Sequence, residues 1–413
     1  MAGGLIGLVA YGAHDVFLTG DPQITYFKSS YRRYTHFQME SIEQDFTGNA
    51  NFGRKVTATV SRNADLIGRA YLQITLPAVT SAGSGSGFSW VNNIGHHIIK
   101  SVRVDVGGQE LDKQYGDWLD VWASLTLPTG QQTNYNQMIG EVTSLTGTFP
   151  GFAASAAAST PEYELMVPLQ FWWNRRSSLY IPLIALQFHD VKLEVEFRPL
   201  VECYRGQYDG SAPVLGATSL WIDYVYLDTD ERKKFAKFPH EYLIEQVQFQ
   251  GEESVNGTNA AIKLTFNHTV KELVWFLRRD DNTDSSSNEY LNYSNYTDKH
   301  TDVDGSNPVS SALLRLNGQD RFRERNGAYF HRVQPYQHHS NGPAEGINVY
   351  SFAIRPEDHQ PSGTVNFSRI DNAELKVTAL SALSGVSKKI SVYATNYNIF
   401  RIGSGLGGLA FAS

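Results

Sequence analysis

The stretch VKLEVEF at 191–197 decides the fold class. Val191, Leu193, Val195 and Phe197 are apolar, and the three residues between them are charged. Successive side chains of a β-strand point to opposite faces, so this alternation gives one apolar and one polar face. Strands of this kind are typical of antiparallel sheets that pack face to face. Similar strand-like stretches lie at 70–76, 101–106, 219–227, 261–266, 272–277, 347–354, 374–380 and 390–398.

Length and composition agree with a large β-protein. The chain has 413 residues, which is enough for two or three domains. Charged residues make up 19% of it, below the roughly 25% of ordinary soluble domains. Aromatic residues make up 12%, with 22 Tyr and 22 Phe, and these residue types favour strands. We therefore predict an all-β fold.

Charge and cysteine content limit the functions that are open to the chain. The net charge is −7, from 35 basic and 42 acidic residues, which argues against a dedicated nucleic-acid binder. Cys203 is the single cysteine, so no intrachain disulfide can form. The first twenty residues lack the basic region of a signal peptide, and their apolar run is too short to cross a membrane. We expect a protein that is made and kept in a reducing cytoplasm.

Short motifs recur in the same order in the two halves of the chain. The pairs are IEQ at 42–44 and 244–246, VGGQE at 106–110 with LNGQD at 316–320, and KLEV at 192–195 with ELKV at 374–377. Three matches in one order suggest an internal duplication. The Gly- and Pro-containing stretch at 206–217 suggests that the seam lies near 210–225. Each half is then a β-sandwich, with long loops at 81–90, 146–163 and 280–308.

No motif for catalysis or cofactor binding is complete. GSGLGG at 403–408 fits G-x-G-x-x-G, but too few residues follow it here for the helix and acidic residue of a dinucleotide site. His331, His338 and His339 are of a metal-binding type, but their spacing around Pro335 favours a polar loop or a subunit contact. We expect no catalytic residues, no metal and no cofactor.

Two other residue patterns indicate surface roles. Basic clusters at 31–34 and 321–332 are interleaved with aromatic residues, which favours subunit contacts over phosphate binding in an acidic protein. Five N-x-S/T triplets are potential glycosylation sites. Of these we select Asn256, Asn292 and Asn295, and expect the last two to be well exposed in the long 280–308 loop.

Taken together, several longer stretches carry a family resemblance. They are GGLIGLVAYGAHDVFLTGDPQITYFKSSYRRYTHF (3–37), VPLQFWWNRRSSLYIPLIALQFHDVKLEV (167–195), IDYVYLDTDERKKFAKFPHEYLIEQVQ (222–248), PSGTVNFSRIDNAEL (361–375) and RIGSGLGGLAF (401–411). With these stretches the chain resembles the major capsid proteins of large nucleocytoplasmic DNA viruses, most of all the algal-virus members. The resemblance implies two consecutive eight-stranded antiparallel jelly rolls.

The same resemblance implies how the protein assembles. It implies a homotrimer of pseudo-hexagonal outline, contacts between these capsomers in an icosahedral capsid, and minor capsid proteins beneath the shell. It implies no direct contact with nucleic acid and only an indirect one with an internal membrane. Aromatic and Arg residues are common interface anchors. The expected subunit contacts are Tyr31, Arg32, Arg33, Tyr34, Arg321, Arg323 and Tyr329.

The resemblance and the repeats together predict five segments. They are an inner-side arm at 1–26, a first jelly roll at 27–212, a linker and strand entry at 213–224, a second jelly roll at 225–402 and a tail at 403–413. The alternative is a carbohydrate-binding or glycan-hydrolysing protein of two β-sandwiches, which the aromatic content and the polar loops also fit. A sugar-binding protein would bind a glycan column, whereas a capsid protein would form a stable trimer.

Overall fold

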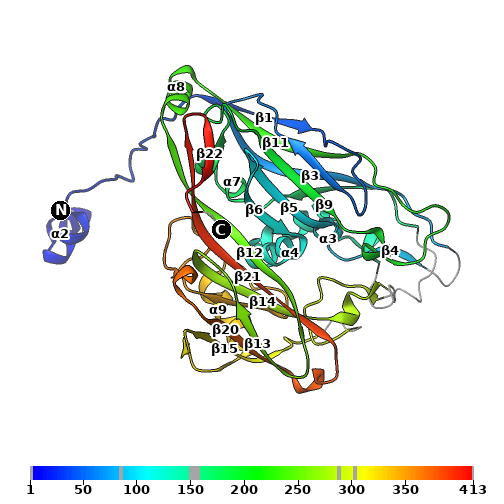
Figure 1. The fold of residues 1–413 in the computed structure, drawn as a ribbon. Helices are drawn as coiled ribbons and strands as arrows, with labels where there is room; N and C mark the ends of the chain where they lie inside the picture. Colours follow the sequence, from blue (N-terminus) through cyan, green and yellow to red (C-terminus); the bar gives the residue numbers. More distant parts are fainter. Residues whose placement is uncertain (1–2, 83–86, 148–158, 286–289, 301–304, 412–413) are drawn as a thin grey trace. The chain divides into compact units, whose positions relative to one another are not determined.

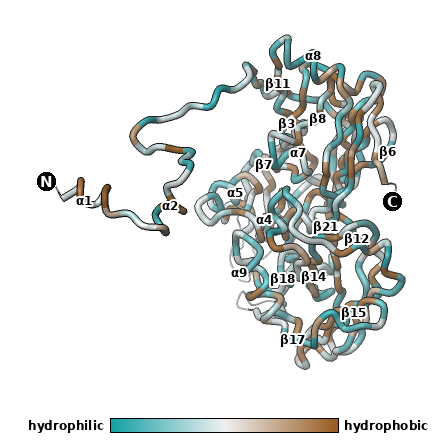
Figure 2. The backbone as a smooth tube through the Cα atoms, turned by 90° about the vertical axis from the view of Figure 1, so that its left-hand side faces the viewer, coloured by the Kyte–Doolittle hydropathy of each residue, from teal (hydrophilic) through white to brown (hydrophobic). Residues whose placement is uncertain are grey.

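The computed structural model describes residues 3–82, 87–147, 159–285, 290–300 and 305–411. These fall into two units, residues 1–36 and residues 37–413. In the first unit, α1 (Gly3–Val9) and α2 (Ala13–Thr19) are followed by a segment without regular structure (Figure 2). Every described side chain of this unit is exposed, including Phe17, Tyr26 and Phe27. We call residues 3–36 the arm.

The first half of residues 37–413 is a sandwich of two antiparallel sheets (Figure 1). One sheet has the order β1 (Phe37–Gln44), β11 (Thr218–Leu227), β3 (Leu66–Leu76), β7 (Tyr163–Pro168). The other has the order β2 (Lys55–Thr59), β9 (Val191–Phe197), β5 (Ile99–Val106), β6 (Gln109–Tyr115). Their apolar faces share one core, in which Leu72 and Ile222 of one sheet meet Val104 and Leu193 of the other. The alternation that we predicted for 191–197 is confirmed by β9.

The second half is a sandwich of the same kind. One sheet has the order β12 (His240–Val255), β21 (Lys388–Gly403), β14 (Thr269–Arg279), β18 (Ile347–Ser351). The other has the order β13 (Asn259–Leu264), β20 (Ala373–Ala379), β15 (Val309–Leu316), β16 (Gln319–Asp320). Its own core includes Leu273, Trp275, Leu314 and Leu375.

The two sandwiches have the same topology. Among the strands named above, the order of each half is first, eighth, third, sixth in one sheet and second, seventh, fourth, fifth in the other. The repeated motifs fall on equivalent elements. IEQ lies in the first strand of each half, KLEV and ELKV lie in the seventh, and VGGQE and LNGQD form the turn between the fourth and fifth. Both turns have two residues of positive φ, Gly107 and Gly108 in one and Asn317 and Gly318 in the other.

The boundary between the sandwiches lies later than the sequence suggested. We placed a linker and strand entry at 213–224, but β11 pairs with β1 and β3 and is the last strand of the first sandwich. The Gly- and Pro-containing stretch is a loop that leads into β11. The chain then crosses through α8 (Thr229–Lys237) to β12.

The C-terminal segment is more ordered than a tail. Residues 406–409 form β22 (Leu406–Leu409), which pairs with the end of β21. The turn before β22 contacts the first sandwich of the same chain, because the Phe188 amide donates to the Gly405 carbonyl at 3.0 Å. The described part of the predicted tail at 403–413 is therefore a strand-forming segment of the second sandwich that also contacts the first.

The first sandwich also carries short helices, some of which pack against the second sandwich. They are α3 (Ile94–His97), α4 (Gly116–Thr126), α5 (Gln132–Met138) and α6 (Thr143–Thr146). Trp118 and Trp122 of α4 share a core with Val274 of β14 and Tyr393 of β21. The two sandwiches are thus joined by a buried apolar contact as well as by the chain. No helix among the described residues is long and apolar enough to cross a membrane.

Candidate functional site

The N-terminal group of predicted contact residues lies on the arm. Tyr31 is 89% exposed and Tyr34 is 82% exposed, and the side chains of Arg32 and Arg33 are also exposed. Leu8 and Phe17 are among the other large apolar side chains of the arm that face solvent. Exposed apolar surface of this kind is common where proteins bind other molecules.

The second group of predicted contact residues lies between β15 and α9 (Gln334–His338). Arg321 and Arg323 are exposed. Tyr329 is half-buried, with the guanidinium of Arg325 4.3 Å from its ring centre and Gln334 donating to its hydroxyl at 3.0 Å. This group lies in residues 37–413, whereas the other group lies in the arm.

Next to Tyr329 is an apolar surface that the sequence analysis did not single out. It consists of Val333, Tyr336 and Ile354, and we call it the α9 surface. Tyr336 is 89% exposed and Ile354 is 70% exposed. A hydrogen bond of 2.9 Å between His338 Nδ1 and the Ile354 carbonyl ties α9 to the loop that carries Ile354. The only sign of this surface in the sequence is Tyr336, an aromatic residue among the mostly polar residues of α9.

The predicted glycosylation residues differ in exposure. Asn256 is exposed in the turn between β12 and β13. Asn292 and Asn295 are half-buried, which corrects the expectation that they are well exposed. Tyr293 lies between them and Tyr296 follows Asn295. Both tyrosines are buried, so this part of the loop lies close to the core. In addition, the Asn295 side chain donates to the Lys299 carbonyl and accepts from Thr297.

The three clustered histidines have separate partners. His331 Nε2 lies 3.0 Å from Glu345, and His338 bonds the Ile354 carbonyl. The side chain of His339 is buried between the carboxylates of Glu272 and Glu357, at 3.1 and 3.0 Å. No group of three or more His, Cys, Asp or Glu side chains in the described ranges could hold a metal ion.

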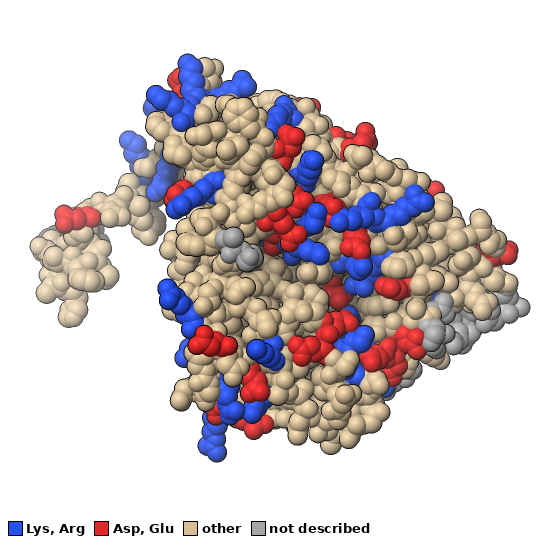
Figure 3. Space-filling model, viewed as in Figure 1, with Lys and Arg blue, Asp and Glu red and all other residues tan. Residues whose placement is uncertain are grey.

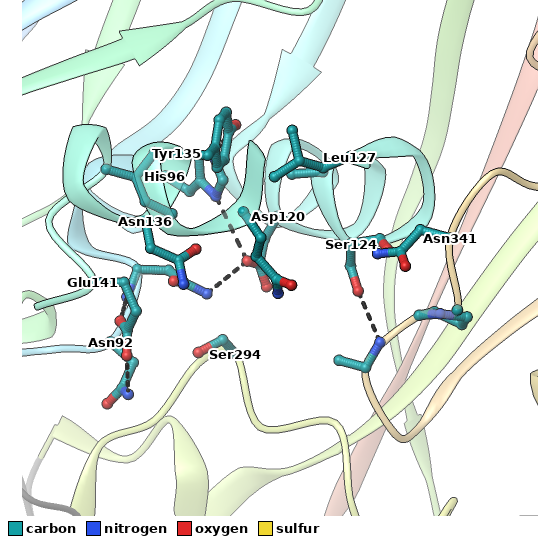
Figure 4. A pocket seen from close by; sticks show the side chains of 17 residues that line it. Asn92, His96, Asp120, Ser124, Leu127, Tyr135, Asn136, Glu141, Ser294 and Asn341 are labelled. Atoms are coloured by element: carbon teal, nitrogen blue, oxygen red, sulfur yellow. Dashed lines mark hydrogen bonds and ion pairs between the residues drawn. The ribbon is translucent and has the colours of Figure 1, made fainter. Parts of the chain in front are cut away.

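A polar cavity of about 370 Å³ lies where the helices of the first sandwich meet loops of the second (Figure 4). We call it the junction cavity. Its wall in the first sandwich is formed by residues before and within α3, α4 and α5, including His96, Asp120 and Tyr135. Ser294 and the segment 341–344 of the second sandwich complete it. The loop at 341–344 is held by the Ala344 amide, which donates to the Ser124 hydroxyl at 2.8 Å.

The comparisons with known proteins identify the family. The family described as "Major capsid protein N-terminus" matches residues 25–228, and "Large eukaryotic DNA virus major capsid protein" matches residues 231–408. The chain belongs to the major capsid proteins of large eukaryotic DNA viruses. The major capsid proteins of Phaeocystis pouchetii virus and Paramecium bursaria Chlorella virus 1 are 44% and 39% identical to it, over 100% of both chains in each case.

Solved structures agree with this assignment. A quasi-atomic structure of the PBCV-1 virus capsid is 33% identical in sequence, with a TM-score of 0.78 over 94% of this chain and 100% of that one. The Faustovirus major capsid protein has a TM-score of 0.79 at 13% identity, which supports the fold alone. The predicted double jelly roll and the predicted family are confirmed. This major capsid protein is a structural component of a virus capsid.

The carbohydrate-binding alternative receives no support from these relatives, which are named as capsid proteins. The charge distribution on the visible face of this major capsid protein is mixed. Basic and acidic side chains alternate across its middle, and basic side chains gather over α8 (Figure 3). One of these, Arg232, is paired with Asp65 at 2.9 Å.

Proposed function

We propose that this major capsid protein forms homotrimers of pseudo-hexagonal outline, and that these capsomers tile an icosahedral shell. The observation that carries the proposal is the common topology of the two sandwiches. Three chains with two similar sandwiches each present six similar units around one axis, and such an object can pack in a hexagonal array. Closed cyclic symmetry then repeats one heterologous contact three times.

The arm supports an assembly in which other chains cover it. Its aromatic and aliphatic side chains are exposed along its whole described length. Tyr31 and Tyr34 flank Arg32 and Arg33, and this mixture of residue types is common at the centres of interfaces. In our proposal the arm lies on the inner side of the shell and meets neighbouring copies and minor capsid proteins. An internal membrane is reached only through those proteins.

A second subunit contact is proposed at the α9 surface and the neighbouring Arg321, Arg323 and Tyr329. The apolar side chains of Tyr336 and Ile354 are among the most exposed of residues 37–413. Arg325 already orders the Tyr329 ring, so less side-chain freedom would be lost when a partner binds there. The arginines around the apolar centre would form a polar rim.

The remaining parts of the proposal concern chemistry and location. The protein has a structural role without enzymatic activity, has no direct contact with nucleic acid, and is made in the host cytoplasm. The net charge of −7 supports the absence of nucleic-acid binding. If glycans are attached, Asn256 is the best exposed of the three selected acceptors.

Light scattering on the purified chain, near neutral pH with a chelator, tests the trimer. We expect a stable mass of three chains and hexagonal outlines in negative-stain images. A monomer that persists at high protein concentration would contradict the proposal. A glycan column run in parallel tests the carbohydrate-binding alternative.

Substitutions then test the contact surface. Tyr336→Ser should weaken the trimer by about tenfold or more, because truncating a central aromatic anchor commonly has that effect. Arg321→Ala combined with Arg323→Ala tests the predicted rim. Val201→Ser is the matched control, because Val201 is an exposed apolar residue in the first sandwich. If neither Tyr336→Ser nor the double arginine variant weakens the trimer, the subunit contact lies at another surface.

A further inference from the structure

The junction cavity has an unusual balance of charge. The carboxyl groups of Asp120 and Glu141 line it, and no Lys or Arg is among the described residues of its wall. The guanidinium of Arg205, outside the wall, donates to the Asn92 side-chain oxygen and interacts through its charge with the Glu141 carboxylate. The wall also carries the acceptor oxygens of Ser124, Asn136 and other polar residues. The described wall therefore offers acceptors and two carboxylates, of which Glu141 has a cation behind it and Asp120 faces only neutral donors and His96.

Both carboxylates are held in place by neutral donors. Asp120 accepts from the Asn93 side chain at 2.8 Å and from the Tyr296 hydroxyl at 2.7 Å. Glu141 accepts from the Asn93 amide at 2.6 Å and from the Asn92 side chain at 2.9 Å. Burial, with a smaller contribution from Asp120, raises the pKa of Glu141 in spite of these bonds and of the nearby charge of Arg205. A bound cation would favour the ionised form of both groups.

His96 supplies an independent sign of a missing partner. Its side chain is buried, and its Nε2 lies 2.7 Å from the Tyr135 hydroxyl. Its Nδ1 makes no hydrogen bond to any described residue, and the Asp120 carboxylate is 3.6 Å away. Figure 4 marks this contact between the two neighbouring side chains with a dashed line. A buried polar atom without a hydrogen bond is costly. In the tautomer whose Nε2–H donates to Tyr135, Nδ1 is an acceptor that a ligand with N–H donors can satisfy.

We propose that the junction cavity binds an alkylammonium or guanidinium group. Such a group has several N–H donors and one positive charge, which matches two carboxylates, an imidazole nitrogen and amide oxygens. The volume of about 370 Å³ is in the range of small-molecule sites. A metal ion fits less well, because no three ligating side chains converge in the described structure.

Because the cavity lies between the two sandwiches, a bound cation would affect the contact between them. Asp120 lies on α4 of the first sandwich, whereas Tyr296 and Ser294 belong to the second. A cation that bridges the wall therefore stabilises the contact between the sandwiches. The inference does not depend on the trimer, because every residue of the wall comes from one chain.

Isothermal titration of the full chain with 1,4-diaminobutane tests the proposal, with 1,4-butanediol as the neutral control. We expect saturable binding of the diamine that weakens with added salt, and none of the diol. Glu141→Gln should lower the affinity about tenfold, the usual effect of losing a hydrogen bond to a charged group. Glu162→Gln, the same change at an exposed position outside the cavity, should leave it unchanged.

A second measurement does not need a variant. The imidazole ¹⁵N signals of His96 should shift on saturation with the diamine, while those of His338 should not. Absence of saturable binding, equal binding of the diol, or an unshifted His96 would overturn the proposal.

A further titration distinguishes the two sources of the cationic group. Nα-acetyl-lysine methylamide that binds as tightly as the diamine indicates a protein side chain. Much weaker binding of this compound indicates a free amine.

Discussion

The guanidinium of Arg278 lies 3.1 Å from the carboxylate of Asp117, across the boundary between the two sandwiches. Arg278 is on β14 and Asp117 is on α4, and both are buried. Arg198 adds a second cation 3.3 Å from Asp117, and Glu252 a second anion 2.8 Å from Arg278. Burial opposes the ionisation of Asp117, but Arg278 and Arg198 outweigh it and hold its pKa well below its usual range. The boundary thus contains a compact network of alternating charges.

Asp117→Ala should lower the free energy of unfolding by about 3 to 5 kcal/mol, because it leaves two buried guanidinium groups facing each other. Urea unfolding at a fixed protein concentration measures this loss. Glu241→Ala is the control, since it breaks the exposed ion pair with Arg401, and such pairs contribute little. If both variants lose the same free energy of unfolding, the buried Asp117 network contributes no more to stability than an exposed ion pair.

A second carboxylate at the boundary predicts a dependence on pH. Asp112 of β6 accepts from the Val247 amide of β12 at 3.0 Å. Burial raises the pKa of Asp112 to about 7 in spite of that bond and one from Gln114. Between its unfolded pKa near 4 and about pH 7, the folded state holds a proton that the unfolded state lacks. The contribution of Asp112 to stability therefore increases as the pH falls through 7, by up to about 4 kcal/mol.

Urea unfolding at pH 6 and pH 8 checks this sign. The wild-type protein should be more stable at pH 6 than at pH 8, and Asp112→Asn should reduce this difference without abolishing it, because unfolding also releases a proton from His339 over part of this range. Glu110→Gln, at the exposed start of the same strand, should keep the difference. A difference as large in Asp112→Asn as in the wild type would assign all of it to other groups.

The strands were predictable because each carries its own periodicity. Val191 to Phe197 alternate in the sequence, and their burial alternates in β9. Helix α4 carried a comparable signal, since Trp118, Leu119, Trp122 and Leu125 recur at helical spacing and are all buried. The prediction missed it because strand-favouring composition outweighed a single helical repeat.

The contact surfaces were less predictable, because exposure depends on the partners of each side chain. Asn292 and Asn295 lie in a polar loop, but Tyr293 and Tyr296 anchor that part of the loop in the interior. The Tyr296 hydroxyl donates to Asp120, which is distant in the chain. The junction cavity likewise combines residues from both halves, and no local pattern could place them together.

A third prediction concerns His339, which is buried between Glu272 and Glu357 with Lys271 next to Glu272. Burial lowers the pKa of His339, but the two carboxylates outweigh it and raise the pKa to about 9. The stabilisation is complete below the unfolded pKa near 6.5 and is lost as the pH rises through about 9. His339→Gln should therefore cost about 3 kcal/mol at neutral pH, because it leaves Glu272 without its nearest cation.

Denaturant unfolding of His339→Gln and wild type at pH 7 and pH 10 measures this. The gap between the two proteins should narrow at the higher pH, where the wild-type imidazole is neutral. His338→Gln provides the adjacent control, since His338 bonds only a carbonyl on the surface loop. A gap of constant size would mean that the charge of His339 has no part in the stabilisation.

The last prediction concerns Gly116, the first residue of α4. A Cβ at this position would overlap the carbonyl oxygens of Ile99 and His96. Both are backbone atoms of packed elements and cannot move independently, so Gly116→Ala should cost about 2 to 3 kcal/mol through overpacking. Gly385→Ala is the matched control, because no atom lies within 4 Å of the added Cβ, and it should stay within about 0.5 kcal/mol of wild type. Thermal unfolding of both variants measures the difference, and equal stabilities would show that α4 can shift away from β5 without loss.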